Sequence, residues 1–230
     1  EELLESYHTE RHAAALENAE ITSATMRFLV PQRAKDHQAR RTTLERALTD
    51  PTAHPGVDSG RLAEPFWYTD SELITPCPQR PFTGRPPRGR APPPCPGVIL
   101  PDAPITHPDG TQRLRHLLRE GHTLLLAEAP GTADRTTHLH TVHTAARRAT
   151  DAPVTAHYLT DLDGTGALTE ALTPRPGEVW LIRPDAHIAA VVDGTDPAAV
   201  HTAVHTALGT VPVPPQSLGP EEHTSTTQAG

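Results

Sequence analysis

The chain has 230 residues with 36% hydrophobic and 3% aromatic content, which allows one ordinary domain with extensions and a core built from aliphatic side chains. Its formal net charge of −8 excludes nucleic acid and anionic membranes as general partners, because binding to phosphates needs a surplus of Lys and Arg. No apolar run reaches the roughly 18 residues of a membrane span and no signal peptide is visible, so we expect a soluble, cytoplasmic protein.

Residues 1–30 are expected to form one helix, because apolar residues recur near helical spacing between charged ones. Pro31 ends or kinks this helix. The helical pattern is already present at Glu1, without the capping residue that normally precedes a helix, and this indicates a fragment of a longer chain. A short second helix is predicted over residues 34–48, and a loop follows it.

A dense series of prolines over residues 76–108 excludes both helix and internal strand. We interpret this stretch as an extended linker. It could bind a proline-recognition domain, although a linker that wraps the surface of its own protein is the commoner case. Cys77 and Cys95 lie within it and are predicted to be unpaired thiols that do no catalysis, because no helix start or basic cluster of the predicted fold adjoins them.

Regular structure is predicted again after this linker. The expected order is a helix over 114–118, strands over 123–127 and 154–159 flanking a helix over 134–149, a short helix over 166–172, strands over 178–183 and 187–192, and a helix over 197–209. The last two strands should form an antiparallel hairpin across the turn Pro184–Ala186, at one edge of a sheet centred on Leu124 to Leu126. A parallel pair with a crossover, then a hairpin and a helix, is typical of the thioredoxin fold.

The start of the helix over 134–149 is where thioredoxin-like enzymes carry their redox cysteines. This chain has Pro130 to Arg135 there, without sulfur, so thiol–disulfide exchange at this site is excluded. Asp134 or Thr132 is predicted to cap the helix. The stretch also departs from a phosphate-binding loop, because Ala129 and Asp134 replace the required glycines and Arg135 replaces the lysine. Nucleotide hydrolysis is therefore not expected.

Two groups of histidines have spacings that could suit a metal ion. They are the pair His201 and His205, four residues apart on one helical face, and the cluster of His138, His140 and His143. The zinc-protease pattern needs a glutamate after the first histidine, where Thr202 stands. We predict solvated histidines and no metal site.

Several short segments resemble the class A FAD-dependent aromatic-ring hydroxylases, the phenol and polyketide hydroxylases. The segments occur in the family's order and are residues 4–12, 26–31, 58–62, 68–71, 89–92, 109–110, 121–125 and 181–185. The first is similar to the family's segment after the flavin site, and the last four, from residue 89 onward, are similar to its C-terminal thioredoxin-like domain. The chain departs from the family at Ala13, which replaces a proline, at Ala186, which replaces a glycine, and at Ala189 or Ala190, where the family has tryptophan.

The resemblance implies a parent monooxygenase in which NAD(P)H reduces FAD and an aromatic, phenolic or polyketide, substrate is hydroxylated. Its partners would be the missing N-terminal FAD and substrate domain, the aromatic substrate and a second copy in a homodimer. The glycine-rich dinucleotide fingerprint and the family's Gly-Asp motif are absent here. We therefore assign no catalytic, cofactor-binding or metal residue, and we predict that this chain alone binds no cofactor and is inactive.

The predicted organisation is an α/β protein with four segments. These are residues 1–30, the terminal helix of a truncated FAD and substrate domain; residues 31–97, a helix and the Pro-rich linker; residues 98–210, a thioredoxin-like domain lacking Cys-x-x-Cys; and residues 211–230, a disordered tail rich in polar residues. The alternative to an enzyme fragment is a free-standing, redox-inactive thioredoxin-like module for binding or dimerisation.

Glu10 and Arg11 belong to the first of the resembling segments. They could contact the edge of the flavin domain, but neighbouring opposite charges on a helix are usually a solvated or interdomain ion pair. We favour this structural role.

Overall fold

The structure is a computed structural model that describes residues 2–58, 61, 64–87, 90–108, 110, 112–129 and 134–210. The tail predicted over 211–230 lies outside the described residues, as do Pro130 to Ala133 of the loop weighed above as a phosphate or redox site. Within the described residues, none of the helices combines the length and the apolar character that a membrane crossing requires.

A four-stranded mixed sheet forms the centre of the larger part of the molecule. Its strands are β1 (His122–Leu126), β2 (Val154–Tyr158), β3 (Glu178–Ile182) and β4 (Ile188–Asp193), in the order β2-β1-β3-β4. β1 pairs parallel with β2 and antiparallel with β3, and β3 pairs antiparallel with β4. This arrangement confirms the thioredoxin-like α/β fold and the hairpin at the edge of the sheet.

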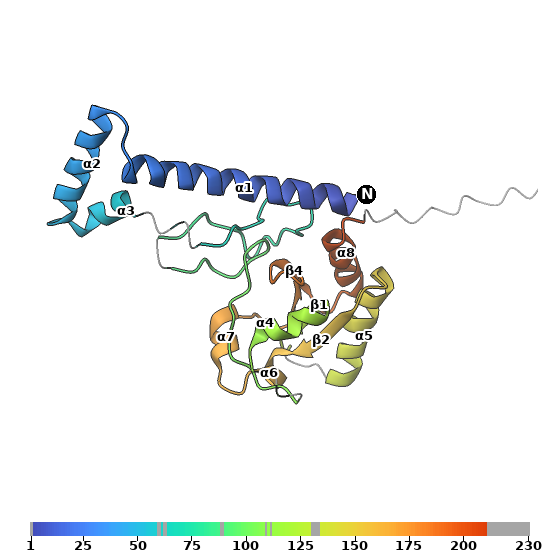
Figure 1. The fold of residues 1–230 in the computed structure, drawn as a ribbon. Coiled ribbons are helices and arrows are strands. Elements are labelled where there is room, and N and C mark those ends of the chain that lie inside the picture. Colours follow the sequence, from blue (N-terminus) through green and yellow to red (C-terminus); the bar gives the residue numbers. More distant parts are fainter. Residues whose placement is uncertain are drawn as a thin grey trace, which may run out of the picture.

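Helices cover both faces of the sheet (Figure 1). They are α4 (Leu114–Leu117), α5 (Arg135–Ala149), α6 (Leu159–Leu162), α7 (Ala167–Leu172) and α8 (Pro197–Ala207), and a 3-10 turn, η3 (Leu118–Glu120), follows α4. One core contains side chains of α4, α6 and α7 beneath Leu125 and Trp180, and a second contains those of α5 and α8 against Leu124 and Leu181. Strand residues alternate between these cores because successive side chains point to opposite faces. We call β1–β4 with α4–α8 the thioredoxin-like body.

The starts of α5 and α8 are specified locally. Asp134 accepts hydrogen bonds from the backbone N–H groups of Thr136 and Thr137, and Asp196 does the same for the two residues after Pro197. These bonds satisfy amide groups that have no partner inside a helix. The predicted cap of α5 is confirmed, with Asp134 rather than Thr132 in this role.

The N-terminal region consists of α1 (Glu2–Leu29), α2 (Ala34–Ala47), the 3-10 turn η1 (Pro51–Ala53) and α3 (His54–Val57). Figure 1 shows α1 passing over the body as one long helix, with α2 and α3 at its far end. We call α1, α2 and α3 the helical arm. α2 contributes no buried residue. Sequence reading placed α1 and α2 correctly, but the short helices α3 and α6 were missed because they are four residues long and lie where a loop and a strand end were expected.

The Pro-rich segment is extended and packs along the outer edge of β4. Gly97 N–H donates to Ile188 O at 2.8 Å, Ile188 N–H donates to Val98 O at 3.0 Å, and Thr75 N–H donates to Ala189 O at 2.9 Å. Gly97 adopts φ +88°, and a Cβ there would lie 2.5 Å from Thr69 Cα, so only glycine fits. The segment thus wraps its own protein, as the commoner of the two interpretations predicted.

The two cysteines are both free thiols, as predicted. Cys95 is buried beside Trp67 and Val98, and burial raises the pKa of its thiol to about 11. Cys77 packs against the core beneath the sheet. Both cysteines therefore lie against the body, because the Pro-rich segment that contains them packs on it.

Candidate functional site at the junction of α1 and the β3–β4 turn

Charged side chains from three distant parts of the chain meet between the arm and the body. Arg183, just after β3, donates two hydrogen bonds to the carboxylate of Glu10 in α1, at 2.7 and 2.8 Å. Ser71 donates its hydroxyl to the same carboxylate at 2.5 Å. The side chains of Glu10 and Arg183 are only 4% and 11% exposed. We call Glu10, Ser71, Arg183 and Asp185 the junction.

The β3–β4 turn determines where Arg183 points. Its backbone N–H donates to His187 O at 2.9 Å, and its carbonyl accepts from Ala186 N–H at 2.9 Å. Its guanidinium also pairs with Asp185 at 2.8 Å. Ala186 adopts φ +70°, a left-handed conformation that favours glycine, the residue found here in the hydroxylases that the sequence resembles. The alanine therefore retains a turn geometry that glycine would adopt more easily.

Aromatic rings surround the junction. Tyr68 is buried, and its ring lies 5.6 Å from the Arg183 guanidinium and 4.5 Å, centroid to centroid, from the His187 ring. Arg11 does not pair with its neighbour Glu10; it lies over the rings of Tyr7 and Tyr68, at 5.4 and 5.9 Å. Such cation–π contacts add modestly to the binding of α1 to the body.

The junction is charged at neutral pH. Burial by itself raises the pKa of Glu10, but the hydrogen bonds from Arg183 and Ser71 and the charge of Arg183 outweigh it and lower that pKa below 4.5. Burial likewise opposes ionisation of Asp185, yet His187 and Arg183 hold its pKa well below 3.8. Carboxylates that accept this many hydrogen bonds and have lowered pKa values are poor general bases. The contacts of the junction hold α1 in place on the body.

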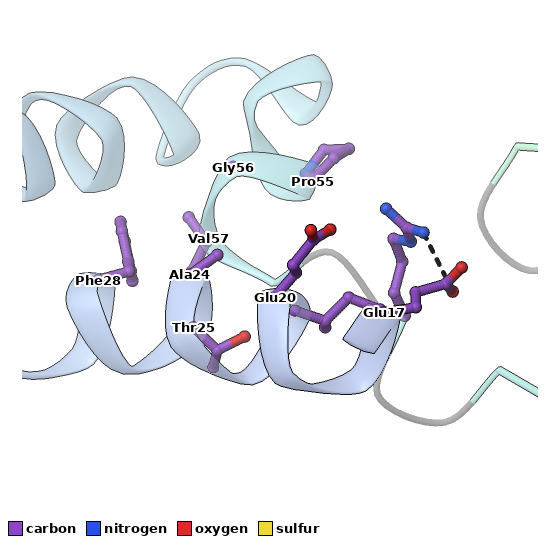
Figure 2. A pocket seen from close by; sticks show the side chains of 10 residues that line it. Glu17, Glu20, Ala24, Thr25, Phe28, Pro55, Gly56 and Val57 are labelled. Carbon is purple, nitrogen blue, oxygen red and sulfur yellow. Dashed lines mark ion pairs between the residues drawn. The ribbon is translucent and has the colours of Figure 1, made fainter. Parts of the chain in front are cut away.

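A second feature of the arm is a hollow of about 340 Å³ between α1 and α3 (Figure 2). Ile21 and Phe28 of α1 and Val57 of α3 form apolar walls. Glu17 lies at one end, paired with Arg61 at 3.2 Å, and Figure 2 shows Glu20 pointing toward Pro55. The remaining lining residues are Ala24, Thr25 and Gly56. Charged side chains, Glu17, Glu20 and Arg61, thus share the lining of the hollow with apolar ones.

Two of the histidines considered as metal ligands make hydrogen-bond contacts within the body. His138 contacts the Tyr158 hydroxyl at 2.7 Å and Gly194 O at 2.9 Å, and His143 contacts Val154 O at 2.9 Å. Expecting these two to be solvated was wrong, because α5 packs across β2. The rings of His201 and His205 lie 4.5 Å apart on α8, and among the described residues no group of three or more His, Cys, Asp or Glu side chains could hold a metal ion.

The N-termini of α5 and α8 do not fit the pyrophosphate of a flavin dinucleotide. A pyrophosphate is normally bound by free amide groups at a helix N-terminus. At α5 and α8 these amides are occupied by the carboxylates of Asp134 and Asp196. A negative charge at each of these positions would repel a phosphate, so we derive no chemical step through a flavin in this chain.

Sequence reasoning identified Glu10 as one half of an ion pair but missed its partners. Arg183 lies 173 residues away in the chain, and Ser71 lies in a loop. One signal was present: all of them occur in segments that resemble one family. Residues that lie in segments resembling one family, and that have no catalytic role, are candidates for contacts with one another.

Residues 93–211 match the family described as "Aromatic-ring hydroxylase, C-terminal". No curated protein matches the chain significantly.

Three solved structures are similar in fold. Aklavinone-11 hydroxylase in complex with FAD and aklavinone is 20% identical, with a TM-score of 0.59 over 90% of this chain and 35% of its own. The flavin-dependent monooxygenase PieE, in complex with FAD and substrate, is 18% identical, with a TM-score of 0.62 over 89% of this chain and 39% of its own. OxyS anhydrotetracycline hydroxylase from Streptomyces rimosus is 21% identical, with a TM-score of 0.51 over 90% and 35%. The chain thus spans little more than a third of the length of each.

Proposed function

The chain belongs to the aromatic-ring hydroxylase C-terminal family, and from this premise we propose that it is the C-terminal portion of an FAD-dependent, NAD(P)H-using monooxygenase that hydroxylates an aromatic, phenolic or polyketide, substrate. The family match, which covers more than half of the chain, is the observation that carries the proposal. The solved structures similar in fold include two complexes with FAD and substrate. The chain spans only about a third of them, which is consistent with chemistry located in a part that precedes it.

Within that enzyme we assign this segment a bracing role. The sequence resemblance places α1 directly after the flavin site, and the junction holds α1 against the body through Glu10 and Arg183. A guanidinium that donates two parallel hydrogen bonds to one carboxylate holds its partner in a defined orientation. We assign residues 1–30 to the end of the FAD and substrate domain, 31–97 to a helix and a linker, and 98–210 to the thioredoxin-like domain.

The free side of α1 is the surface we assign to the missing N-terminal domain. Leu4, Met26 and Leu29 fall on one side of the helix at 3.6 residues per turn, and each is at least half exposed. Large apolar side chains gathered along one helix indicate a surface that another part of a protein covers. The helix therefore has one side bound to the body and another side available for the flavin domain.

The first test uses the chain alone. Mixed with excess FAD and desalted, it should retain no flavin absorbance and should not oxidise NAD(P)H when phenols are added. Both expectations follow because a dinucleotide held only at its edge loses most of its contacts. One flavin retained per chain would contradict the fragment assignment.

The second test uses the protein encoded by the complete reading frame. It should purify with FAD, consume NAD(P)H and oxygen, and add one oxygen atom to a phenol or polyketide ring. A complete protein that binds no flavin would contradict the proposed enzyme and would instead support the free-standing binding module.

A further inference from the structure

A hollow of about 270 Å³ lies apart from the junction and the arm, where the Pro-rich segment passes α4. Its lining comes from three stretches of the chain: residues 64–67, residues 90–101 and α4, which contributes Arg115. Apolar side chains form most of the wall, and four of them are prolines: Pro65, Pro92, Pro94 and Pro101. We call this space the Trp67 hollow, after the largest side chain in its wall.

Backbone hydrogen bonds fix one wall of the Trp67 hollow to the body. Val98 O accepts from Ile188 N–H at 3.0 Å, and Leu100 N–H donates to Ala186 O at 2.7 Å. Ile188 belongs to β4 and Ala186 to the turn before it, so this wall is anchored on the sheet. Small-molecule sites are usually formed before the ligand binds, and a wall held in this way meets that condition.

The charged groups in the lining leave a surplus of positive charge. Glu64 is paired with Arg85 at 2.5 Å. Arg90 has no ion-pair partner among the described residues, and the Arg115 guanidinium donates to a neutral group, Leu100 O, at 2.9 Å. This surplus stands out in a chain with a net charge of −8. Guanidinium groups match the two oxygens of a carboxylate, so the lining favours an anion of this type.

A buried indole N–H in the wall also lacks a partner. Trp67 is only 9% exposed, and its Nε1 makes no hydrogen bond within the part of the chain that the structure describes. Its ring is held by Arg85, which lies 4.6 Å from the ring centre, and by Phe82, whose ring lies 5.8 Å away. Indole N–H groups usually find a partner when they are buried. An oxygen atom of a ligand in the hollow would supply one.

The volume of the hollow limits the ligand to about one ring. A cavity of about 150 Å³ is enough for benzene, so 270 Å³ leaves room for a ring with one short substituent. Proline rings and an indole are flat apolar surfaces against which a planar ring packs well. The apolar wall therefore suits the ring, and the guanidinium groups suit an acidic substituent.

From these observations we propose that the Trp67 hollow binds a small aromatic carboxylate. The ring packs against Trp67 and the prolines, and the carboxylate pairs with Arg90 and Arg115. The site lies entirely within this chain and needs no flavin. The proposal therefore goes beyond the proposed function and does not depend on the assigned monooxygenase activity.

NMR titration of the 230-residue chain with benzoate tests the proposal. Benzoate should bind saturably with a dissociation constant of about 1 mM or lower. Benzyl alcohol lacks the charge and acetate lacks the ring, so each should bind at least about tenfold more weakly. The proposal would be overturned if benzoate showed no saturable binding up to about 20 mM, or if benzyl alcohol bound as tightly as benzoate.

Two arginine variants test the predicted contact with the carboxylate. Arg90→Gln removes a guanidinium that has no ion pair to lose, and it should weaken benzoate binding about fivefold or more. Arg148→Gln is the matched control, because it removes the same charge from an exposed position on α5. This control should bind benzoate like the unchanged chain. Equal affinities of the two variants would contradict the assigned role of Arg90.

The two tryptophans of the chain provide a readout that locates the ligand. Trp67 lines the hollow, whereas Trp180 is fully buried in the core beneath the sheet, and both indole N–H groups lack a partner among the residues described. In chain labelled with ¹⁵N-tryptophan, benzoate should shift the Trp67 indole signal and leave the Trp180 signal in place. Trp67→Phe assigns the two signals. A shift confined to Trp180, or no shift at either, would place benzoate outside the hollow and overturn the proposal.

Discussion

The thioredoxin-like body and the helical arm bury very different shares of their side chains. In the body, Leu124, Leu168 and Trp180 are fully buried between the sheet and its helices, whereas α2 of the arm buries nothing and Leu48 at its end is 85% exposed. The body therefore contains the cores that stabilise it. The arm is held by its own helical hydrogen bonds and by ion pairs such as those of the junction, and several of its large apolar side chains are exposed.

The largest difference in unfolding free energy is expected when one leucine in each region is replaced by alanine. Leu124→Ala should lower the free energy of unfolding by about 2–5 kcal/mol, because it removes buried methyl groups and leaves a cavity. Leu48→Ala should change it by less than about 0.5 kcal/mol, since its side chain is already in water. Urea unfolding followed by circular dichroism measures both. Equal costs would mean that the arm and the body share one core.

A smaller effect is expected from breaking the connection between the two regions. Glu10→Gln should lower the free energy of unfolding by about 2–3 kcal/mol, because the buried Arg183 loses its charged partner. It should also increase the cleavage of α1 in limited proteolysis.

Glu45→Gln is the matched control for this substitution. It removes one partner of the exposed Arg41–Glu45 pair and should cost less than about 0.5 kcal/mol. If both glutamine variants unfold alike, the junction does not hold the arm on the body.

The smallest effect on the free energy of unfolding is expected when the pH is lowered. The pKa of Glu10 lies below 4.5 in the folded chain. The ionised carboxylate therefore contributes its full stabilisation at pH values above the pKa of the unfolded chain, and this stabilisation is lost as the pH falls through the pKa of the folded chain. Between pH 7 and pH 4.5 the difference in unfolding free energy between the unchanged chain and Glu10→Gln should stay nearly constant.

Below pH 4.5 this difference should shrink as Glu10 becomes protonated. Burial lowers the pKa of His122 and adds a separate loss of stability below pH 6.5, but this loss is common to both proteins and cancels. Denaturant titrations of both proteins at a series of pH values measure the difference. A difference that grows toward low pH would contradict the sign assigned to Glu10.

Local patterns predicted much of the body. The hairpin of β3 and β4 and the Asp caps of α5 and α8 follow from alternation and turn chemistry over a few neighbouring residues. Contacts between segments that are distant in the sequence could not be predicted in this way. The burial of Cys95 and the hydrogen bonds of His138 arise because remote segments pack on the sheet, and no local pattern carries that information.

The junction also combines residue properties that the sequence determined with contacts that only the tertiary structure decided. The sequence by itself determined that residues 2–29 favour a helix, that Glu10 carries a charge on it and that a turn follows Ile182, because these properties depend on near neighbours. Only the tertiary structure decided that Glu10 pairs with Arg183 rather than Arg11 and that β2 is the last strand of the sheet among the described residues. Both outcomes depend on which surfaces come together when the cores close, since burial makes an ion pair specific and strand order decides which backbone groups lack a partner.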